Sequence, residues 1–222
     1  MIENILFPVD FSAACVGMAA NVKRVARLFH SRVTLLHVCD LASHNGFELY
    51  SRTPQEIAEE HWCIAQQRLD SFLECDFPAS HFPRVLRGGD PSQEIVELAH
   101  SGDFDLIVMP THAGRFQQML LGSTTAKVLE DADCMVMTAG HADTAVPEPL
   151  GDRHWVCGID FGPQSERLVR LASRAAEQAH AHLSFVHRER SQSWQWQHSR
   201  IRRATKANSG APRRPRGSNL ER

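Results

Sequence analysis

The chain has 222 residues, 42% of them hydrophobic, which suits one large domain or one domain and part of another. Its formal net charge of −2 hides an uneven distribution, because the segment from residue 188 onward holds ten Lys and Arg against two Asp and Glu. The other 14 basic and 24 acidic residues give residues 1–187 a net charge of −10. This acidic body is a poor candidate for nucleic-acid binding, and only the basic tail has the sign for weak contact.

The sequence gives no sign of export or membrane insertion. Its first residues, MIENILFPVD, lack the basic and long apolar regions of a secretory signal, and no apolar run approaches the roughly 18–20 residues of a membrane helix. The six cysteines are scattered without a C-x-x-C pair. We therefore expect a cytoplasmic protein with reduced cysteines and no membrane partner.

Strand and helix patterns alternate over the first 140 residues. Short apolar runs predict strands at 4–10, 32–38, 84–88, 104–110 and 134–139, and helical spacing or start signals predict helices at 14–29, 53–74, 90–102 and 123–131. Thr53, Pro54 and Glu56 form a capping-box start, and Asp90 with Pro91 forms a second start signal.

The helix that begins after Thr53 has apolar residues three or four positions apart. These residues are Ala58, Trp62, Ala65, Leu69 and Phe72. The spacing predicts one buried helix face, with Trp62 and Phe72 in the core rather than on a stacking platform.

Five strands that alternate with four helices predict an open, doubly wound, five-stranded parallel sheet of the Rossmann-like α/β class. Ligands of such sheets bind beyond the carboxyl ends of the strands, where the strand order reverses. The residues predicted to lie there are Asp10, Val38 and the segment 110–115.

A repeat of the first unit begins after residue 153. The stretch 6–38 aligns without a gap with 156–188 at an offset of 150, and the apolar pattern matches as well. Identical pairs include Asp10 with Asp160, Phe11 with Phe161, Arg24 with Arg174, Ala26 with Ala176, His30 with His180, and His37 with His187. The repeat predicts a second strand, helix and strand.

The second unit breaks off after His187 into a segment with arginine clusters, Pro, Gly and Ser. We expect a domain over 1–140, a linker over 141–153, a partial βαβ repeat over 154–187 and a disordered basic tail over 188–222. A βαβ piece alone cannot bury both faces of its sheet. It could pack against the first domain, pair with another chain, or have little stability of its own.

Taken together, five stretches resemble the universal stress protein family. They are NILFPVDFS, VTLLHV, GDPSQEIVELA, DFDLIVMPTH and LLGSTTAKVLEDADCMV, which lie within residues 2–140 of the first unit. The chain looks like a tandem member whose second unit is cut short. The resemblance implies the same α/β fold, a dimer, and a role in stress tolerance, and many members bind ATP.

Nucleotide-binding members resemble one another in a loop written G-x2-G-x9-G-[ST] after the fourth strand. Glycines let the backbone approach phosphate, and a helix N-terminus supplies a positive field. Here Pro110 and Ala113 stand at the first two glycine positions, and eight residues rather than nine separate Ala113 from Gly122. Gly122 and Ser123 match the end of the motif, and Gly114 could replace the second glycine in a shifted register.

The resemblance implies an adenine-nucleotide site whose cofactor is ATP, possibly with Mg²⁺. The candidate residues are Pro8, Asp10, Phe11, Ser12, Val38, Met109, Pro110, Thr111, His112, Gly114, Arg115, Gly122, Ser123 and Thr124. Asp10 matches the family aspartate near adenosine, and Val38 matches the position whose backbone meets the adenine edge. Pro110 donates no N–H, so one phosphate contact is lost, while His112 and Arg115 could add positive charge.

Simpler interpretations compete with several of these residues. Asp10 could cap the following helix near Ser12, and Ser123 and Thr124 could only cap theirs. His112 could be an exposed loop residue with no catalytic role. The spacing of His37, Cys39 and His44 matches no strong zinc pattern, so we expect no metal site. Trp194 and Trp196 could stack on single-stranded nucleic acid, but a tail without function is the favoured interpretation.

Three functions follow. The first is a stress-response regulator that binds ATP or a related adenine nucleotide and signals occupancy through a homodimer formed by the strand at 134–139. The alternative is a nucleotide-free interaction or adaptor protein of the same fold that has lost the loop. The least favoured is a slow ATPase that relies on phosphate positioning and Mg²⁺, since the sequence shows no catalytic residues.

Overall fold

The computed structural model describes residues 2–39, 53–111, 122–139 and 154–187. Its first unit is a five-stranded parallel sheet in the order β3-β2-β1-β4-β5. The strands are β1 (Asn4–Pro8), β2 (Arg32–Cys39), β3 (Arg84–Gly88), β4 (Leu106–Pro110) and β5 (Met135–Ala139). This arrangement confirms the predicted open, doubly wound α/β fold, and it places β5 at one edge of the sheet.

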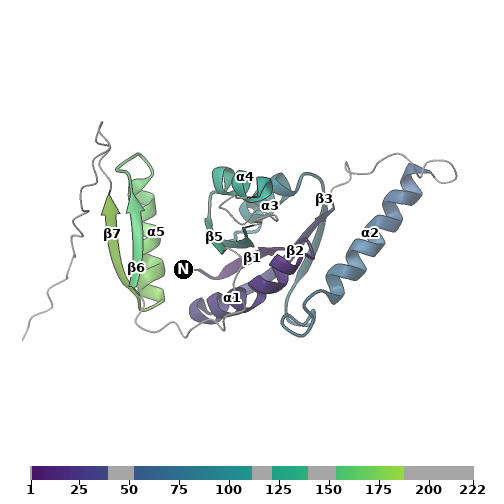
Figure 1. The fold of residues 1–222 in the computed structure, drawn as a ribbon, viewed down its shortest axis with the longest axis horizontal. Helices are drawn as coiled ribbons and strands as arrows, with labels where there is room; N and C mark the ends of the chain where they lie inside the picture. Colours follow the sequence, from purple (N-terminus) through teal and green to yellow (C-terminus); the bar gives the residue numbers. More distant parts are fainter. Residues whose placement is uncertain (1, 40–52, 112–121, 140–153, 188–222) are drawn as a thin grey trace, which may run out of the picture. The chain divides into compact units, whose positions relative to one another are not determined.

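Four helices connect the strands: α1 (Ala13–Phe29), α2 (Pro54–Ser71), α3 (Pro91–Ser101) and α4 (Ser123–Asp131). Helices α3 and α4 cover one face of the sheet, and α1 lies on the other (Figure 1). The Ser12 hydroxyl caps α1 by accepting from the Cys15 N–H. The capping box predicted at Thr53 and Glu56 is present, and Asp90 caps α3 as expected.

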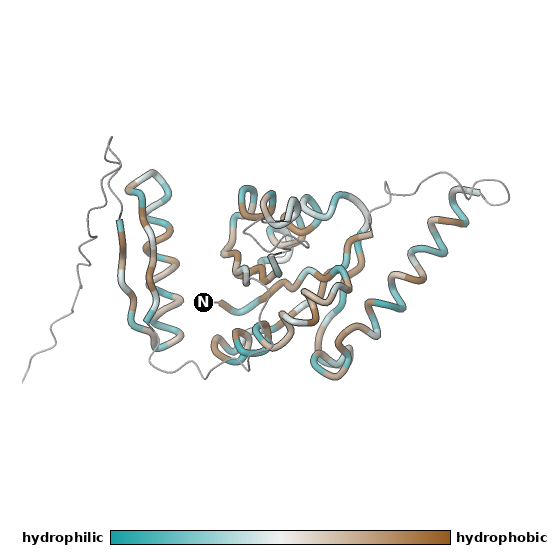
Figure 2. The backbone as a smooth tube through the Cα atoms, viewed as in Figure 1, coloured by the Kyte–Doolittle hydropathy of each residue, from teal (hydrophilic) through white to brown (hydrophobic). Residues whose placement is uncertain are grey.

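Alternation along the strands builds one core on each side of the sheet. Leu6, Leu36 and Ile107 join Ile95 of α3 and Val128 of α4 in one cluster. Their sequence neighbours point to the opposite face, which α1 covers. These neighbours include Ile5, Phe7, Val33 and Leu35, and the buried residues of α1 include Met18, Val22, Val25 and Phe29. The strands accordingly carry much of the apolar colour in Figure 2.

Helix α2 differs from the prediction of one continuous buried face. Ala65 and Leu69 are buried and Phe72 is half-buried, but Ala58 is exposed and the Trp62 side chain is 41% exposed. The placement of Trp62 in the core was therefore wrong. Only the C-terminal half of α2 lies against the sheet, and the N-terminal half extends past it (Figure 1). A periodic apolar pattern fixes the face of a helix but not how far its partner surface reaches.

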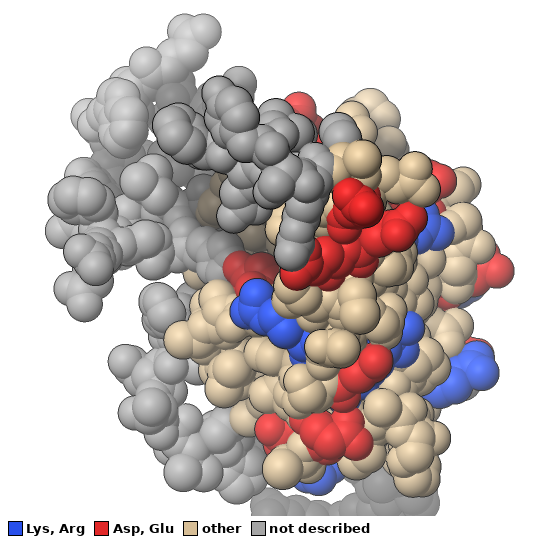
Figure 3. Space-filling view, turned by 90° about the vertical axis from the view of Figure 1, so that its right-hand side faces the viewer, with Lys and Arg blue, Asp and Glu red and all other residues tan. Residues whose placement is uncertain are grey.

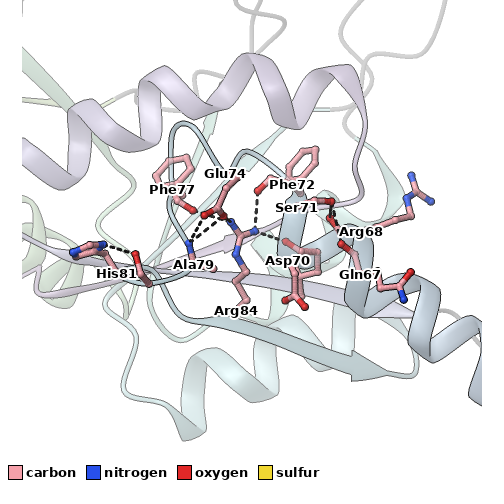
Figure 4. Close-up of polar contacts among 12 residues, drawn as sticks. Gln67, Arg68, Asp70, Ser71, Phe72, Glu74, Phe77, Ala79, His81 and Arg84 are labelled. Atoms are coloured by element: carbon pink, nitrogen blue, oxygen red, sulfur yellow. Dashed lines mark hydrogen bonds and ion pairs between the residues drawn. The ribbon is translucent and has the colours of Figure 1, made fainter.

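The C-terminal end of α2 is held by Arg84 of β3 (Figure 4). The Arg84 guanidinium donates to the carbonyls of Leu69, Phe72 and Phe77 and pairs with Glu74 at 2.9 Å. Only 4% of the Arg84 side chain is exposed. One planar cation thus binds two carbonyls at the end of α2 and a third in the turn that follows.

A separate second unit consists of β6 (His154–Ile159), α5 (Ser165–Gln178) and β7 (His182–His187). Strands β6 and β7 are parallel, and their register is that of β1 and β2 displaced by 150 residues, from Asn4↔Arg32 to His154↔His182. The predicted strand, helix and strand are confirmed. The linker at 141–153 and the tail at 188–222 lie outside the described residues, so the domain boundaries stay predictions.

The surface of the first unit is acidic over α2. Glu56, Glu59 and Glu60 are exposed on the N-terminal half of this helix, and Figure 3 shows acidic side chains gathered on this side of the molecule. Phosphate backbones are repelled by such a surface. Among the described residues, no helix has the length and apolar character required to span a membrane.

Candidate functional site

The strand order reverses between β1 and β4. From β1 the chain proceeds to β2 and β3 on one side, and β4 then lies on the other side of β1 and is followed by β5. The connections after β1 and β4 therefore diverge to opposite faces at their carboxyl ends, and this is the place at which open α/β sheets commonly bind their ligands. Asp10 follows β1, and Thr111 follows β4. The sequence-predicted site lies at this edge.

A tight turn presents Asp10 at the end of β1. Oδ1 of Asp10 accepts from the Ser12 N–H at 3.0 Å and lies 3.0 Å from the Cys15 Sγ. Phe11, between them, has a positive φ of 62°, which is unusual for a residue with a side chain. The Asp10 carboxylate is exposed and oriented by the first turn of α1. Ser12, and not Asp10, is therefore the N-cap of α1, and Asp10 accepts from the N–H of this cap residue.

The Phe11 ring lies in an aromatic cluster on the α1 and α2 face. It packs against the His37 ring with 4.2 Å between centroids and edge-on against Phe72 at 5.3 Å, and the Arg68 guanidinium lies 4.5 Å from its centroid. The Nδ1 of His37 lies 2.7 Å from the Val9 carbonyl oxygen. Burial, the largest cause, and the Arg68 charge lower the pKa of His37, so a neutral imidazole that donates Nδ1–H to Val9 fits this contact.

The N-terminus of α4 lies beside the carboxyl end of β4. The Thr125 hydroxyl donates to the Pro110 carbonyl at 3.3 Å and is buried, which fixes the first turn of α4 to the strand. Gly122 is the N-cap of α4, and among the described residues no side chain forms a cap hydrogen bond to this helix. Ser123 and Thr124 are helical residues, so the interpretation in which they cap α4 is wrong. Gly122 thus gives the first-turn N–H groups of α4 no cap from its own side chain.

The structure brings the predicted residues together only in part. Asp10, Phe11, Ser12 and Val38 follow or end β1 and β2, while Pro110, Thr111, Gly122, Ser123 and Thr124 lie at β4 and α4. Pro8 and Met109 are buried in the sheet, so a ligand could meet them through the backbone. His112, Gly114 and Arg115 lie outside the described residues, as does Ala113. These positions belong to the first half of the family loop, in which Pro110 and Ala113 stand in place of glycines.

Two residues at this edge escaped the sequence analysis. Cys15 contacts the Asp10 carboxylate, and Thr125 joins α4 to Pro110. The repeat held a signal for the first, since Cys15 aligns with Ser165 and both can donate a hydrogen bond. In the described parts of the chain, no three His, Cys, Asp or Glu side chains converge as metal ligands. His44 lies outside those parts.

Comparison with known proteins gives a family. The model of the universal stress protein family matches residues 1–139. A universal stress protein of Methanocaldococcus jannaschii is 28% identical over 142 residues, covering 61% of this chain and 80% of the relative. One from Methanothermobacter thermautotrophicus is 42% identical over 59 residues, so the match spans only 27% of this chain and 40% of that relative.

A solved structure supports the fold. The crystal structure of a universal stress protein from Archaeoglobus fulgidus DSM 4304 matches with a TM-score of 0.57 and 22% identity, over 84% of this chain and 67% of the other. The predicted resemblance is thereby confirmed at the level of sequence and of architecture. The chain belongs to the universal stress protein family.

Proposed function

We propose that this protein binds ATP or a related adenine nucleotide at the carboxyl ends of β1, β2 and β4 and acts as a nucleotide-dependent regulator in the stress response. Other universal stress proteins have been solved in complex with cAMP and, in Arabidopsis thaliana, with AMP bound. Those findings describe those proteins. For the present chain, the support comes from its own residues at the reversal of strand order.

The observation that carries the proposal is the start of α4. Helices α1, α2 and α3 each begin with a side chain that accepts a backbone N–H, from Ser12, Thr53 and Asp90. Helix α4 begins at Gly122, which has no side chain to fill this role. A phosphate group at this position would accept hydrogen bonds from the first turn and interact favourably with the helix dipole. The Ser123 and Thr124 hydroxyls would add donors.

The nucleoside would lie toward β1 and β2 in this proposal. Asp10 offers a carboxylate of defined orientation, and Val38 is the penultimate residue of the neighbouring strand β2, close to the same edge. The Phe11 ring packs against His37 and Phe72, and the Arg68 guanidinium of α2 lies over it. This cluster keeps the turn that carries Asp10 in one conformation.

A second candidate, a nucleotide-free adaptor, is favoured by Pro110. This residue has no N–H to offer a phosphate, and its carbonyl already accepts from Thr125. The Pro110 carbonyl is therefore already engaged by a contact within the protein. In this alternative the chain would act through a homodimer that pairs the edge strand β5. Analytical ultracentrifugation tests the dimer, and a monomer at all protein concentrations would contradict it.

Two substitutions at Gly122 separate the candidates. With φ at −60° and ψ at 150°, Gly122 has a backbone that any residue can adopt. Gly122→Asn would supply a neutral cap, and Gly122→Asp would supply a cap of equal shape with a negative charge. We expect both variants to fold. We expect ATP affinity to fall in both, by about tenfold or more in Gly122→Asp, because its carboxylate replaces and repels the phosphate.

Isothermal titration calorimetry with ATP and Mg²⁺ measures the affinities, and thermal unfolding confirms that each variant is folded. Asp90→Asn, which changes a cap of the same kind on α3, is the matched control and should leave ATP affinity unchanged. The absence of heat and of any stabilisation of the wild-type protein at millimolar ATP would contradict the proposal and favour the adaptor. ATP or ADP bound to protein purified from its own cells would exclude the adaptor.

A further inference from the structure

The carboxylate of Asp10 is held from α1 by a thiol. The Cys15 Sγ lies 3.0 Å from Oδ1 of Asp10, and its second neighbour, the Pro8 carbonyl oxygen, is farther away at 3.9 Å. The same Oδ1 accepts from the Ser12 N–H at 3.0 Å. Two donors from the start of α1 therefore converge on one oxygen, which restrains the position of the carboxylate.

The thiol is suited to be a constant donor. The Cys15 residue is only 2% exposed, and burial raises the pKa of its thiol to about 12. The group thus keeps its proton throughout the neutral range and can only donate to the carboxylate. A protonated thiol is also a poor nucleophile, so the role of Cys15 is that of a hydrogen-bond donor and not of a reactive group.

The second unit repeats this contact with another atom. Ser165, which aligns with Cys15, donates from its hydroxyl to Oδ1 of Asp160 at 2.9 Å, and the Gly162 N–H donates to the same oxygen at 2.8 Å. The donor and the aspartate recur together, while sulfur is replaced by oxygen. The feature that the two copies share is a hydrogen bond from this helix position to the aspartate.

We propose that Cys15 is a positioning residue of the site, whose thiol holds the Asp10 carboxylate in the orientation that meets the nucleoside. This inference rests on the proposed nucleotide function. It assigns to Cys15 a role that acts through Asp10 and requires only a hydrogen-bond donor. Serine should therefore replace cysteine, because Ser165 shows that a hydroxyl at this helix position reaches the aspartate oxygen.

The test compares Cys15→Ala with Cys15→Ser by calorimetry with ATP and Mg²⁺. We expect Cys15→Ala to weaken ATP binding about fivefold, the change for the loss of one ordinary hydrogen bond. We expect Cys15→Ser to stay within about twofold of the wild-type protein. Ser165→Ala is the matched control, because it removes the equivalent bond in the second unit and should leave ATP affinity unchanged.

A second measurement reports on Asp10 without any ligand. Three-bond NMR couplings give the χ1 rotamer populations of Asp10, which we expect to be a single rotamer in the wild type and in Cys15→Ser and a mixture in Cys15→Ala. If the wild type binds no ATP, the proposed function fails, yet these populations still decide whether Cys15 positions Asp10. Equal populations in all three proteins would overturn the inference, as would equal ATP affinities in a wild type that binds.

Discussion

The protein contains two copies of one strand-helix-strand arrangement that differ in what covers them. In both copies the Asp-Phe turn has a positive φ at Phe, 62° at Phe11 and 58° at Phe161. In both, this ring packs against a histidine, with centroids 4.2 and 4.4 Å apart. The histidine Nδ1 in turn lies 2.7 or 2.9 Å from a carbonyl at the end of the preceding strand.

Burial separates the two copies. Leu6 is fully buried, whereas Val156 at the equivalent position is 65% exposed, and Phe161 is 71% exposed while Phe11 is only partly so. In the first unit, β3 and β4 extend the sheet on both sides. Arg68 in α2 and Phe72 at the end of this helix cover Phe11. The turn geometry is therefore local in origin, because it recurs without those elements, while core formation depends on the strands and helices that follow.

The largest effect is expected from Arg84, which has no aligned counterpart in the second unit. Arg84→Ala would leave the carbonyls of Leu69, Phe72 and Phe77 without their buried donor and should destabilise the first unit by about 4 kcal/mol. Native-state hydrogen exchange of the β1 and β2 amides measures this loss. The β6 and β7 amides, followed in the same sample, show whether the effect stays within the first unit.

Arg84→Lys and Arg87→Ala are the controls. A lysine ammonium keeps the charge but not the planar fork, so it should recover only part of the loss. Arg87 pairs with Glu94 at 3.1 Å but is 28% exposed, and its removal should cost less than about 1 kcal/mol. An Arg84→Ala variant as protected as the Arg87→Ala variant would contradict a structural role for Arg84.

A matched pair of truncations tests the difference in burial directly. Leu6→Ala removes a fully buried side chain that packs with Leu36, Ile107 and Val128, and should cost about 3 kcal/mol. Val156→Ala, at the aligned position, removes a mostly exposed side chain and should change stability by less than about 0.5 kcal/mol. Hydrogen exchange in each unit reports both. A cost at Val156 comparable to that at Leu6 would show that another surface covers β6.

The sequence predicted every described strand and helix, because hydrophobic period and capping residues are local signals. The start of α2 at Thr53 and that of α3 at Asp90 followed from their caps. Trp62 was misplaced because its environment depends on where the sheet ends, which no local pattern contains. The contacts of Arg84 were missed because its partners at the end of α2 and in the following turn are backbone carbonyls, which no residue type marks in the sequence.

For the candidate site, the sequence predicted a location in the fold, and its role in binding stays a prediction. Parallel strand order fixed the edge, and the repeat and family motif indicated Asp10 and Gly122. The contacts of Cys15 and Thr125 depend on side-chain geometry between elements and had no motif of their own. The sequence did not show that the N-cap of α4 is Gly122, because the next residue, Ser123, is of a type that often caps helices. The helix boundary in the structure shows it.

The smallest expected effect is the pH dependence of stability that arises from the lowered pKa of His37. Burial, chiefly, together with the Arg68 charge, lowers the pKa of His37 below 6.5, while the contacts with Val9 and Asp10 act in the opposite direction. The unfolded chain therefore binds more protons than the folded one between the folded pKa and 6.5. The His37 contribution to stability is complete above this window and is lost as the pH falls through it.

NMR titration of the His37 ring measures this pKa, and Arg68→Gln isolates the contribution of α2. Removal of the cation should raise the pKa of His37 only part of the way to 6.5, because burial is the larger cause. Stability of the first unit should accordingly decline less on acidification from pH 6.5 in Arg68→Gln than in the wild type. A wild-type His37 that titrates at or above 6.5 would contradict the burial of this ring in solution.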